Sequence, residues 1–177
     1  LSKGAIYHHF SSKLDILLRI ADQIVTVNSD MLGEIRDRKG VTGAEKLREL
    51  FRAAVLQDYQ QKLLGMMPCL LDNPQFLAML IRSILHDAAP HYVQPILEEG
   101  MADGSIQTDS PRELSQVLLL LTDLWVAPIL EPAGPEEVRS RCRLFNQLTR
   151  PFGVALLDEE LMQQLESYWR SKPENRS

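Results

Sequence analysis

The side chains best suited to chemistry stand at the start of the sequence, in the stretch LSKGAIYHHFSSKLDIL. This stretch has no acidic residue before Asp15, although the chain as a whole is acidic. Ser2 and Lys3 fall at the beginning of a predicted short helix, where free N–H groups and the helix dipole favour phosphate. Tyr7 and His8 can donate hydrogen bonds to phosphate oxygens or to base edges. Taken without its neighbours, however, a Lys-Gly pair next to aromatic residues is more often a turn beside a core.

Metal binding and catalysis are not indicated by the residue spacing. Adjacent His8 and His9 point about 100° apart on a helix, so they do not chelate one metal ion as an i, i+4 pair does. Cys69 and Cys142 lie far apart without CxxC spacing, which argues against a zinc site or a disulfide framework and fits a reducing cytoplasm. No nucleophile–base pair or phosphate-binding loop is present. We therefore expect no enzyme, no cofactor and no metal.

The composition limits the class of protein to which the chain can belong. The 177 residues include 19 Lys and Arg against 24 Asp and Glu, a formal charge of -5, so the chain does not coat nucleic acid with its whole surface. Apolar residues make up 45%, enough for a sizeable core in one domain or one domain with a small appendage. The apolar run VLLLLTDLWVAPIL is interrupted by Asp123 and Pro128 and is too short for a membrane span. We expect a cytoplasmic protein that does not enter the membrane.

The elements that must position these side chains are all predicted to be helices. Apolar residues recur at threes and fours over 12–39 and 42–64, with Lys46 placed on the polar side of the second helix. Asn73-Pro74 predicts a cap and first turn, and Ser110-Pro111 predicts another. Further helices are expected to start at Gly134-Pro135 and near Leu157. Strand patterns and internal repeats are absent, so the predicted fold class is all-α.

Two prolines and two histidines lie in the middle of the chain. Pro90 and Pro95 interrupt an otherwise helical spacing, which predicts a kinked or restarted helix up to the turn at 102–104. His86 and His91 flank Pro90, and we interpret them as surface or packing residues.

The opening stretch resembles the end of the DNA-binding domain of the TetR family of transcriptional regulators. The family pattern of recognition helix and following junction is matched at ten positions: Ser2, Lys3, Gly4, Ile6, Tyr7, His9, Phe10, Ser12, Lys13 and Ile16. The resemblance implies a helix-turn-helix whose short helix enters the major groove. The residues implied to contact DNA are Ser2, Lys3, Gly4, Tyr7, His8 and Lys13. Ile6 and Phe10 would pack inward, and His9 is open between the two roles.

The resemblance also implies a division of the chain. Residues 1–20 would be the C-terminal remnant of the DNA-binding domain, and residues 21–177 a ligand-binding and dimerisation domain. Family members carry about two further helices before this point, so we expect a truncated chain. Taken literally, such a chain would bind DNA poorly, because its recognition helix lacks a scaffold.

A weaker resemblance continues in ILEEGMADGSI and SPREL, patterns common in the regulatory halves of this family. It implies a four-helix homodimer interface built by two late helices of each subunit, here Arg112–Val126 and Glu136–Leu148. The apolar residues on nearly every side of the first of these helices fit that role. A long core helix of a monomer is the alternative.

The same analogy places an effector pocket between the middle helices. Its implied residues are Tyr59, Leu63, Met66, Met67, Met79, Ser83 and Trp125. Methionines adapt to irregular apolar ligands, yet residues of these types at helical spacing are also ordinary core residues. For Asp123, the most conspicuous polar residue in an apolar run, we favour a structural role, as a cap or hydrogen-bonding group within the interface, over contact with an effector.

These interpretations predict a TetR-like transcriptional regulator of double-stranded DNA, a repressor that leaves its operator when a small apolar effector binds. The alternative is a helical ligand-binding or dimerisation module without DNA-binding activity.

Overall fold

The computed structural model describes residues 29–56, 73–127 and 133–170. Every regular element in these ranges is a helix, which confirms the all-α class. Residues 29–37 form the first described helix. It is followed by α3 (Gly43–Leu56), α5 (Pro74–Ser83), η1 (Ile84–Val93), α6 (Gln94–Asp103), α7 (Pro111–Leu121), η2 (Thr122–Val126), α8 (Pro135–Thr149), η3 (Arg150–Phe152) and α9 (Glu159–Arg170).

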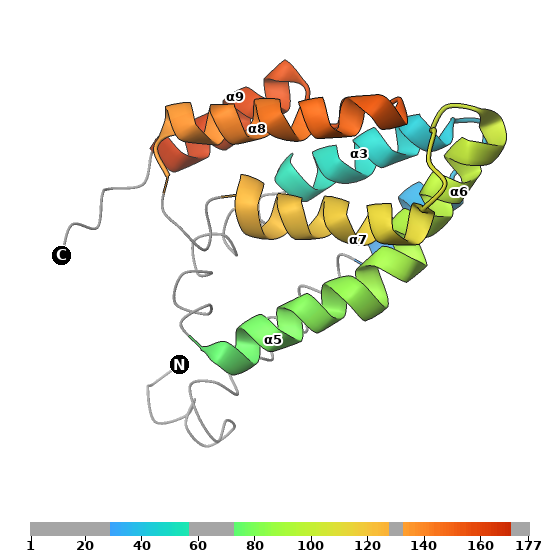
Figure 1. The fold of residues 1–177 in the computed structure, drawn as a ribbon, viewed down its shortest axis with the longest axis horizontal. Coiled ribbons are helices and arrows are strands. Elements are labelled where there is room, and N and C mark those ends of the chain that lie inside the picture. The colour runs from blue at the N-terminus through green and yellow to red at the C-terminus, as the bar shows by residue number, and fades with distance from the viewer. Residues whose placement is uncertain (1–28, 57–72, 128–132, 171–177) are drawn as a thin grey trace, which may run out of the picture.

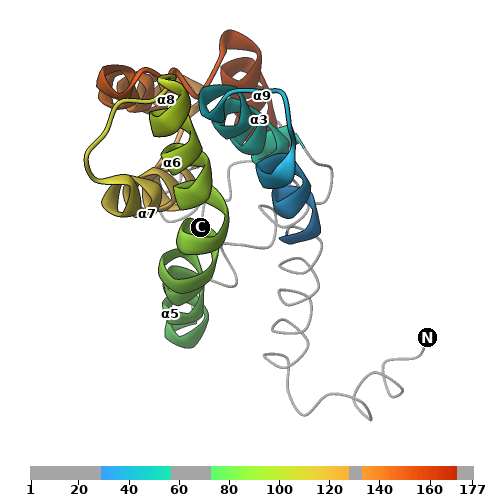
Figure 2. The same cartoon turned by 90° about the vertical axis from the view of Figure 1, so that its right-hand side faces the viewer.

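The helices surround one apolar core. In Figure 1, α8 and α9 run together along one side; α3 packs against α9 and α6, and α8 also contacts η2 at the end of α7. Figure 2 shows α5 and α6 as one long column, with α7 on one flank and α3 on the other. The rings of Phe51 and Phe145 lie 6.2 Å apart at the centre, tilted by 45°. Around them Leu47, Val93 and Ile96 are completely buried.

Local sequence chemistry explains several helix ends. The Asn73 side chain accepts hydrogen bonds from the backbone N–H groups of Gln75 (2.9 Å) and Phe76 (3.3 Å), as the Asn-Pro pair predicts. Gly104 ends α6 with a φ of 79°, a left-handed conformation that favours glycine. Ser110 begins α7 at the predicted position, but its hydroxyl donates to Asp109 and does not cap the helix. The predicted boundary was therefore right and the predicted cap was wrong.

The helix expected to kink near Pro90 continues without a break from α5 through η1 into α6. The ten residues of η1 form a π-helix, in which the Gln94 N–H reaches back five residues to the Ala89 carbonyl. Proline lacks an N–H, and its ring collides with the carbonyl four residues earlier in an α-helix. The wider π turn relieves this conflict while the helix continues.

Lys46 corrects the predicted polar face of α3. Its side chain is only 1% exposed, whereas we expected it to face solvent. The ammonium donates to the Glu99 carboxylate on α6 and to the Arg36 carbonyl (2.8 Å) at the end of the 29–37 helix. A buried ammonium is tolerated only when it is paired and hydrogen-bonded. Lys46 therefore joins three helices.

The backbones of α3 and α6 touch at two glycines. A Cβ atom added to Gly43 would lie 2.3 Å from the Gly100 nitrogen and 2.7 Å from the Ile96 carbonyl oxygen. These neighbours are backbone atoms, which cannot move aside as a flexible side chain can. The contact brings the first turn of α3 close enough for the Gly43 N–H to donate to Asp103 (2.8 Å).

We predict that Gly43→Ala lowers the free energy of unfolding by about 3 kcal/mol, because the added methyl forces the two helices apart. Gly33→Ala is the matched control, since a Cβ there meets nothing within 4 Å and the helix favours alanine. We expect it to raise stability by about 0.5–1 kcal/mol. Urea unfolding followed by circular dichroism measures both, and equal effects of the two variants would contradict the close approach.

We also predict that Glu99→Gln lowers the free energy of unfolding by about 2 kcal/mol, because it leaves the Lys46 ammonium without its counter-ion. The double variant Lys46→Met/Glu99→Gln removes the buried charge and should recover most of that loss. Glu98→Gln, on the exposed side of α6, is the control and should change stability by no more than about 0.5 kcal/mol. The urea midpoints of the variants measure these changes in stability. If Glu99→Gln behaves like Glu98→Gln, the ion pair contributes nothing.

Candidate functional site

The residues implied to contact DNA fall outside the described part of the chain. They are Ser2, Lys3, Gly4, Tyr7, His8 and Lys13, and the description begins at residue 29. Their assignment stays a prediction. What the structure does describe is how the 29–37 helix, the next segment, is attached to the helical body.

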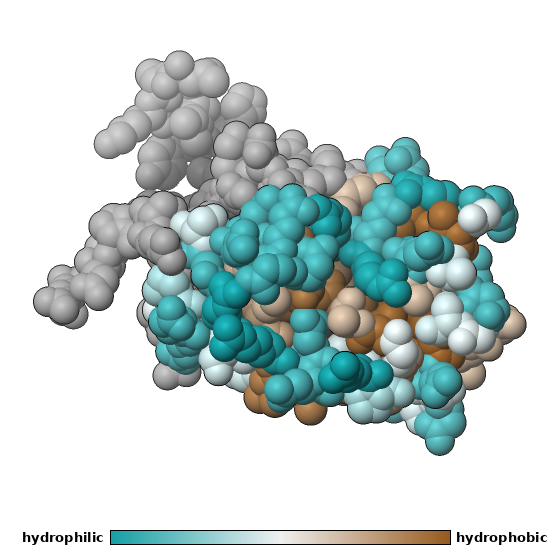
Figure 3. All heavy atoms as spheres, turned by 90° about the horizontal axis from the view of Figure 1, so that it is seen from above, coloured by the Kyte–Doolittle hydropathy of each residue, from teal (hydrophilic) through white to brown (hydrophobic). Residues whose placement is uncertain are grey.

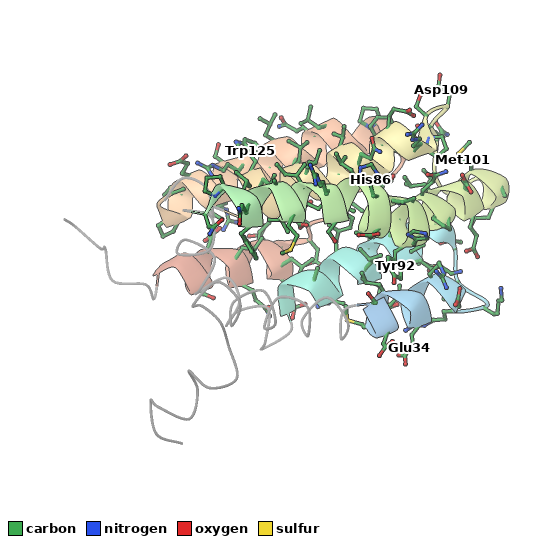
Figure 4. All side chains as sticks on the ribbon, turned by 90° about the horizontal axis from the view of Figure 1, so that it is seen from below. Glu34, His86, Tyr92, Met101, Asp109 and Trp125 are labelled. Atoms are coloured by element: carbon green, nitrogen blue, oxygen red, sulfur yellow. The ribbon has the colours of Figure 1, made fainter. Side chains whose placement is uncertain are left out.

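That attachment is centred on Arg36. Its guanidinium lies 5.7 Å from the centre of the Tyr92 ring and donates to the His91 carbonyl (2.9 Å), both on η1. Figure 4 shows Tyr92 on the side of the long helix that faces the 29–37 helix. The same guanidinium donates to Asp37, and this hydrogen bond lowers the pKa of the Asp37 carboxyl. Together with Lys46, these contacts fix the end of the 29–37 helix against η1 and α3.

The second region of interest is the π-helical turn η2 at the end of α7. The Ala127 N–H bonds to the Thr122 carbonyl at 3.2 Å, five residues back, and the Thr122 hydroxyl donates to Leu118 (2.7 Å). Short π-helical segments inside α-helices are frequent at functional sites. This segment carries Asp123 and Trp125, the two residues singled out in the sequence.

Trp125 is held on α8 by Arg141. The guanidinium lies 5.9 Å from the centre of the indole ring and donates to the Trp125 carbonyl (3.0 Å) and to Glu137 (2.5 Å). The Arg141 side chain is 8% exposed, so this contact is largely shielded from water. A desolvated cation–π contact of this kind contributes about 2 kcal/mol. One face of Trp125 is thus occupied by the protein itself.

The structural role favoured for Asp123, as a cap or hydrogen-bonding group within a dimer interface, stays a prediction, because the structure describes a single chain. Among the described residues, no hydrogen bond or ion pair reaches its carboxyl. Burial alone raises the pKa of Asp123 to about 7.

The predicted effector-pocket residues are only partly described. Tyr59, Leu63, Met66 and Met67 lie outside the described residues, and the remaining three are Met79, Ser83 and Trp125. Met79 and Ser83 share one face of α5, the former 39% exposed and the latter half-buried. Trp125 packs against the core from η2. The pocket as a whole stays a prediction.

An open hollow of about 470 Å³ lies at the other end of the molecule, between the start of α3 and the end of α6. Its carboxylates already have partners within the protein. Glu45 accepts hydrogen bonds from Thr42, Asp103 from Gly43 and Ser105, and Glu99 from Lys46. This hollow is distant in sequence from every predicted effector residue, and we do not assign the effector to it.

Apolar side chains remain exposed on α7 and α8, the helices expected to form a dimer. Val117 is 49%, Leu144 44% and Leu148 50% exposed. Leu144 and Leu148 are one helical turn apart on α8, and half-buried Leu120 and Leu121 follow Val117 along α7. Figure 3 looks down on the side of α8 and α9 and shows hydrophobic residues in brown between hydrophilic ones. Exposed apolar residues mark an interaction surface where they form one contiguous patch, and the dimer interface on α7 and α8 stays a prediction.

The described ranges give no support for a metal site or a membrane-spanning helix. They contain no group of three or more His, Cys, Asp and Glu residues that could hold a metal ion, and no helix there is long and apolar enough to cross a membrane. Burial raises the pKa of Cys142 to about 11, so its thiol is protonated at neutral pH. His86 and His91 are both exposed, in agreement with their interpretation as surface residues.

Two important residues were missed by sequence reasoning. Lys46 stands three residues after Gly43 and four before Leu50, a spacing that places it on the buried face of α3. That spacing was a usable signal, but the charge of lysine outweighed it. Arg141 similarly stands three residues after buried Val138 and four before Phe145.

Comparisons of the chain with protein-family models, with curated proteins and with solved structures give no match.

Proposed function

We propose that the protein is a TetR-like transcriptional regulator, a repressor that leaves its operator when a small effector binds within its helical body. The observation that carries this proposal is the match of the opening stretch to the family pattern at ten positions. A single Lys-Gly pair would carry little weight, but ten positions in register specify a short helix, a junction and the start of a second helix.

The described fold supports the proposal in two ways. The body is entirely helical in the described ranges, as a regulatory domain of this family requires. In addition, the helix that follows the DNA-contacting stretch in sequence is fixed to the body by Arg36 and Lys46. A rigid attachment of this kind would let a change in the body alter the position of the preceding residues.

DNA binding by the protein, expressed from its complete coding sequence, tests the proposal. We expect it to bind DNA from upstream of its own gene, and Tyr7→Ala and Lys13→Ala each to weaken binding about tenfold by removing a contact. Lys13→Ala should also reduce the slope of log affinity against log salt by about one, because one phosphate contact is lost.

Lys39→Ala is the control for this assay. Lys39 is exposed and lies beyond the 29–37 helix, away from the proposed DNA contacts, so its loss should leave affinity and salt slope nearly unchanged. Mobility shift or fluorescence anisotropy at several salt concentrations gives both quantities. Failure of the unmodified protein to bind DNA would favour the alternative, a helical ligand-binding or dimerisation module.

The exposed apolar side chains of α7 and α8 support a homodimer within this proposal. We expect the protein to sediment with twice the mass of one chain, and Leu144→Glu/Leu148→Glu to weaken association at least about 100-fold, because two carboxylates would be buried in the interface.

Met101→Glu is the matched control, since Met101 is also exposed (39%) but lies near the end of α6. Analytical ultracentrifugation over a range of concentrations separates the variants. A monomer at all concentrations, or equal effects of the α8 pair and Met101→Glu, would exclude this interface.

A further inference from the structure

Pro95 deprives the long helical column of one hydrogen-bond donor. In an α-helix each carbonyl accepts a hydrogen bond from the N–H four residues later, and proline has no N–H. The residue four positions before Pro95 is His91, so Pro95 cannot supply the α-helical bond to the His91 carbonyl. The change from π-helix to α-helix falls at the same point, since η1 ends at Val93 and α6 begins at Gln94. The His91 carbonyl is therefore an acceptor that another part of the molecule can use.

Arg36 supplies a donor to this carbonyl from the 29–37 helix. Its Nη1 donates to the His91 carbonyl at 2.9 Å. Its Nε and Nη2 donate to Asp37 at 2.7 and 2.8 Å, so the neighbouring carboxylate holds one edge of the guanidinium and leaves Nη1 for η1. The same group lies 5.7 Å from the centre of the Tyr92 ring, within the range of a cation–π contact. Figure 4 shows Tyr92 between the long column and the 29–37 helix.

The backbone of Arg36 is bound as well. Its carbonyl lies in the last turn of the 29–37 helix, where the helix itself offers no further N–H. The Lys46 ammonium donates to this carbonyl at 2.8 Å. Arg36 thus joins its helix to η1 through the side chain and to α3 through the backbone. We call the contacts of Arg36 with His91, Tyr92 and Lys46 the Arg36 latch.

Apolar packing holds the 29–37 helix less firmly than it holds α3. Among residues 29–37 only Ile35 is buried, and Met31 and Leu32 pack half-buried against the core. The buried side chains of α3 include Ala44, Lys46, Leu47, Leu50 and Phe51. Segments with few buried apolar contacts open at a lower free-energy cost than the core does. The polar contacts of the latch therefore contribute a large share of the attachment of this helix.

We propose that the 29–37 helix is a separable arm and that the Arg36 latch is the switch between its docked and open states. In the docked state Arg36 binds the carbonyl that Pro95 leaves without a donor. In the open state the arm leaves the surface while the helices from α3 to α9 keep their packing. Residues 1–28 precede the arm in the chain, so the latch acts where they join the described body. The inference does not rest on the proposed function, since it concerns the attachment of a helix and not a contact with DNA.

Hydrogen exchange on the complete protein tests whether the arm opens by itself. Phe145→Leu removes part of the central aromatic pair and should speed exchange of the α3 and α8 amides about tenfold by lowering global stability. A local opening of the arm does not involve that pair, so exchange of the arm amides should change by less than about twofold. Mass spectrometry of peptic peptides measures both rates. An arm that speeds up together with α3 and α8 is not separable, and the proposal is then wrong.

Arg36→Met tests the latch itself, because it removes the guanidinium and keeps an apolar side chain. We expect exchange of the arm amides to rise about tenfold. Arg36→Lys keeps the charge without the planar fork and should raise it about threefold. Arg38→Met is the matched control, since Arg38 stands two positions later and pairs with Glu49 at the surface, where ion pairs contribute little. Equal effects of Arg36→Met and Arg38→Met would overturn the assignment.

Pro95→Ala tests the link between the proline and the latch. Alanine offers an N–H to the His91 carbonyl, so this carbonyl keeps a donor when the guanidinium is lost. In the Pro95→Ala background, Arg36→Met should raise exchange of the arm less than about threefold. Gln94→Ala leaves Pro95 in place and is the control background, in which the effect should stay about tenfold.

A tenfold effect of Arg36→Met in both backgrounds would exclude the role of the proline and overturn the proposal. Circular dichroism establishes that the variants are folded. Because hydrogen exchange requires no DNA, failure here leaves the regulator proposal standing, and failure to bind operator DNA leaves the separable arm standing.

Discussion

The buried ammonium of Lys46 is the contact on which the arrangement of the described helices depends. A charge in that position must be neutralised, so α6 has to present Glu99 and the 29–37 helix has to present the Arg36 carbonyl at the same point. Apolar contacts alone would permit the helices to slide, since they are not directional. One ion pair and one hydrogen bond instead select a single register for three helices.

The glycine contact makes this ion pair possible. Gly43 stands three residues before Lys46, and Gly100 stands one residue after Glu99, so the closest backbone approach lies beside the charged pair. With a larger residue at Gly43, the helices would be separated and the ammonium would not reach its carboxylate at the same distance. Packing and electrostatics are therefore coupled here and contribute to stability together.

Sequence reasoning succeeded where the deciding chemistry is local. Asn73-Pro74 and Gly134-Pro135 mark helix starts because caps and first-turn prolines act within a few residues. It failed where the deciding contact joins distant residues, since the partner of Lys46 is 53 positions away. For the candidate site, composition singled out Asp123 and Trp125, but only the three-dimensional arrangement separates a tryptophan held by Arg141 from a carboxyl without a partner.

The unbroken column of α5, η1 and α6 has one more consequence. It runs for thirty residues, from Pro74 to Asp103, which at helical rise is roughly 40 Å. One end begins at the Asn73 cap, and the other carries Glu99, the partner of Lys46. A helix resists compression along its axis, so a tilt of the α5 end is carried to the α6 end with little loss. A displacement of the α5 end would thus reach the support of the 29–37 helix, and the two ends would communicate mechanically without any intervening loop.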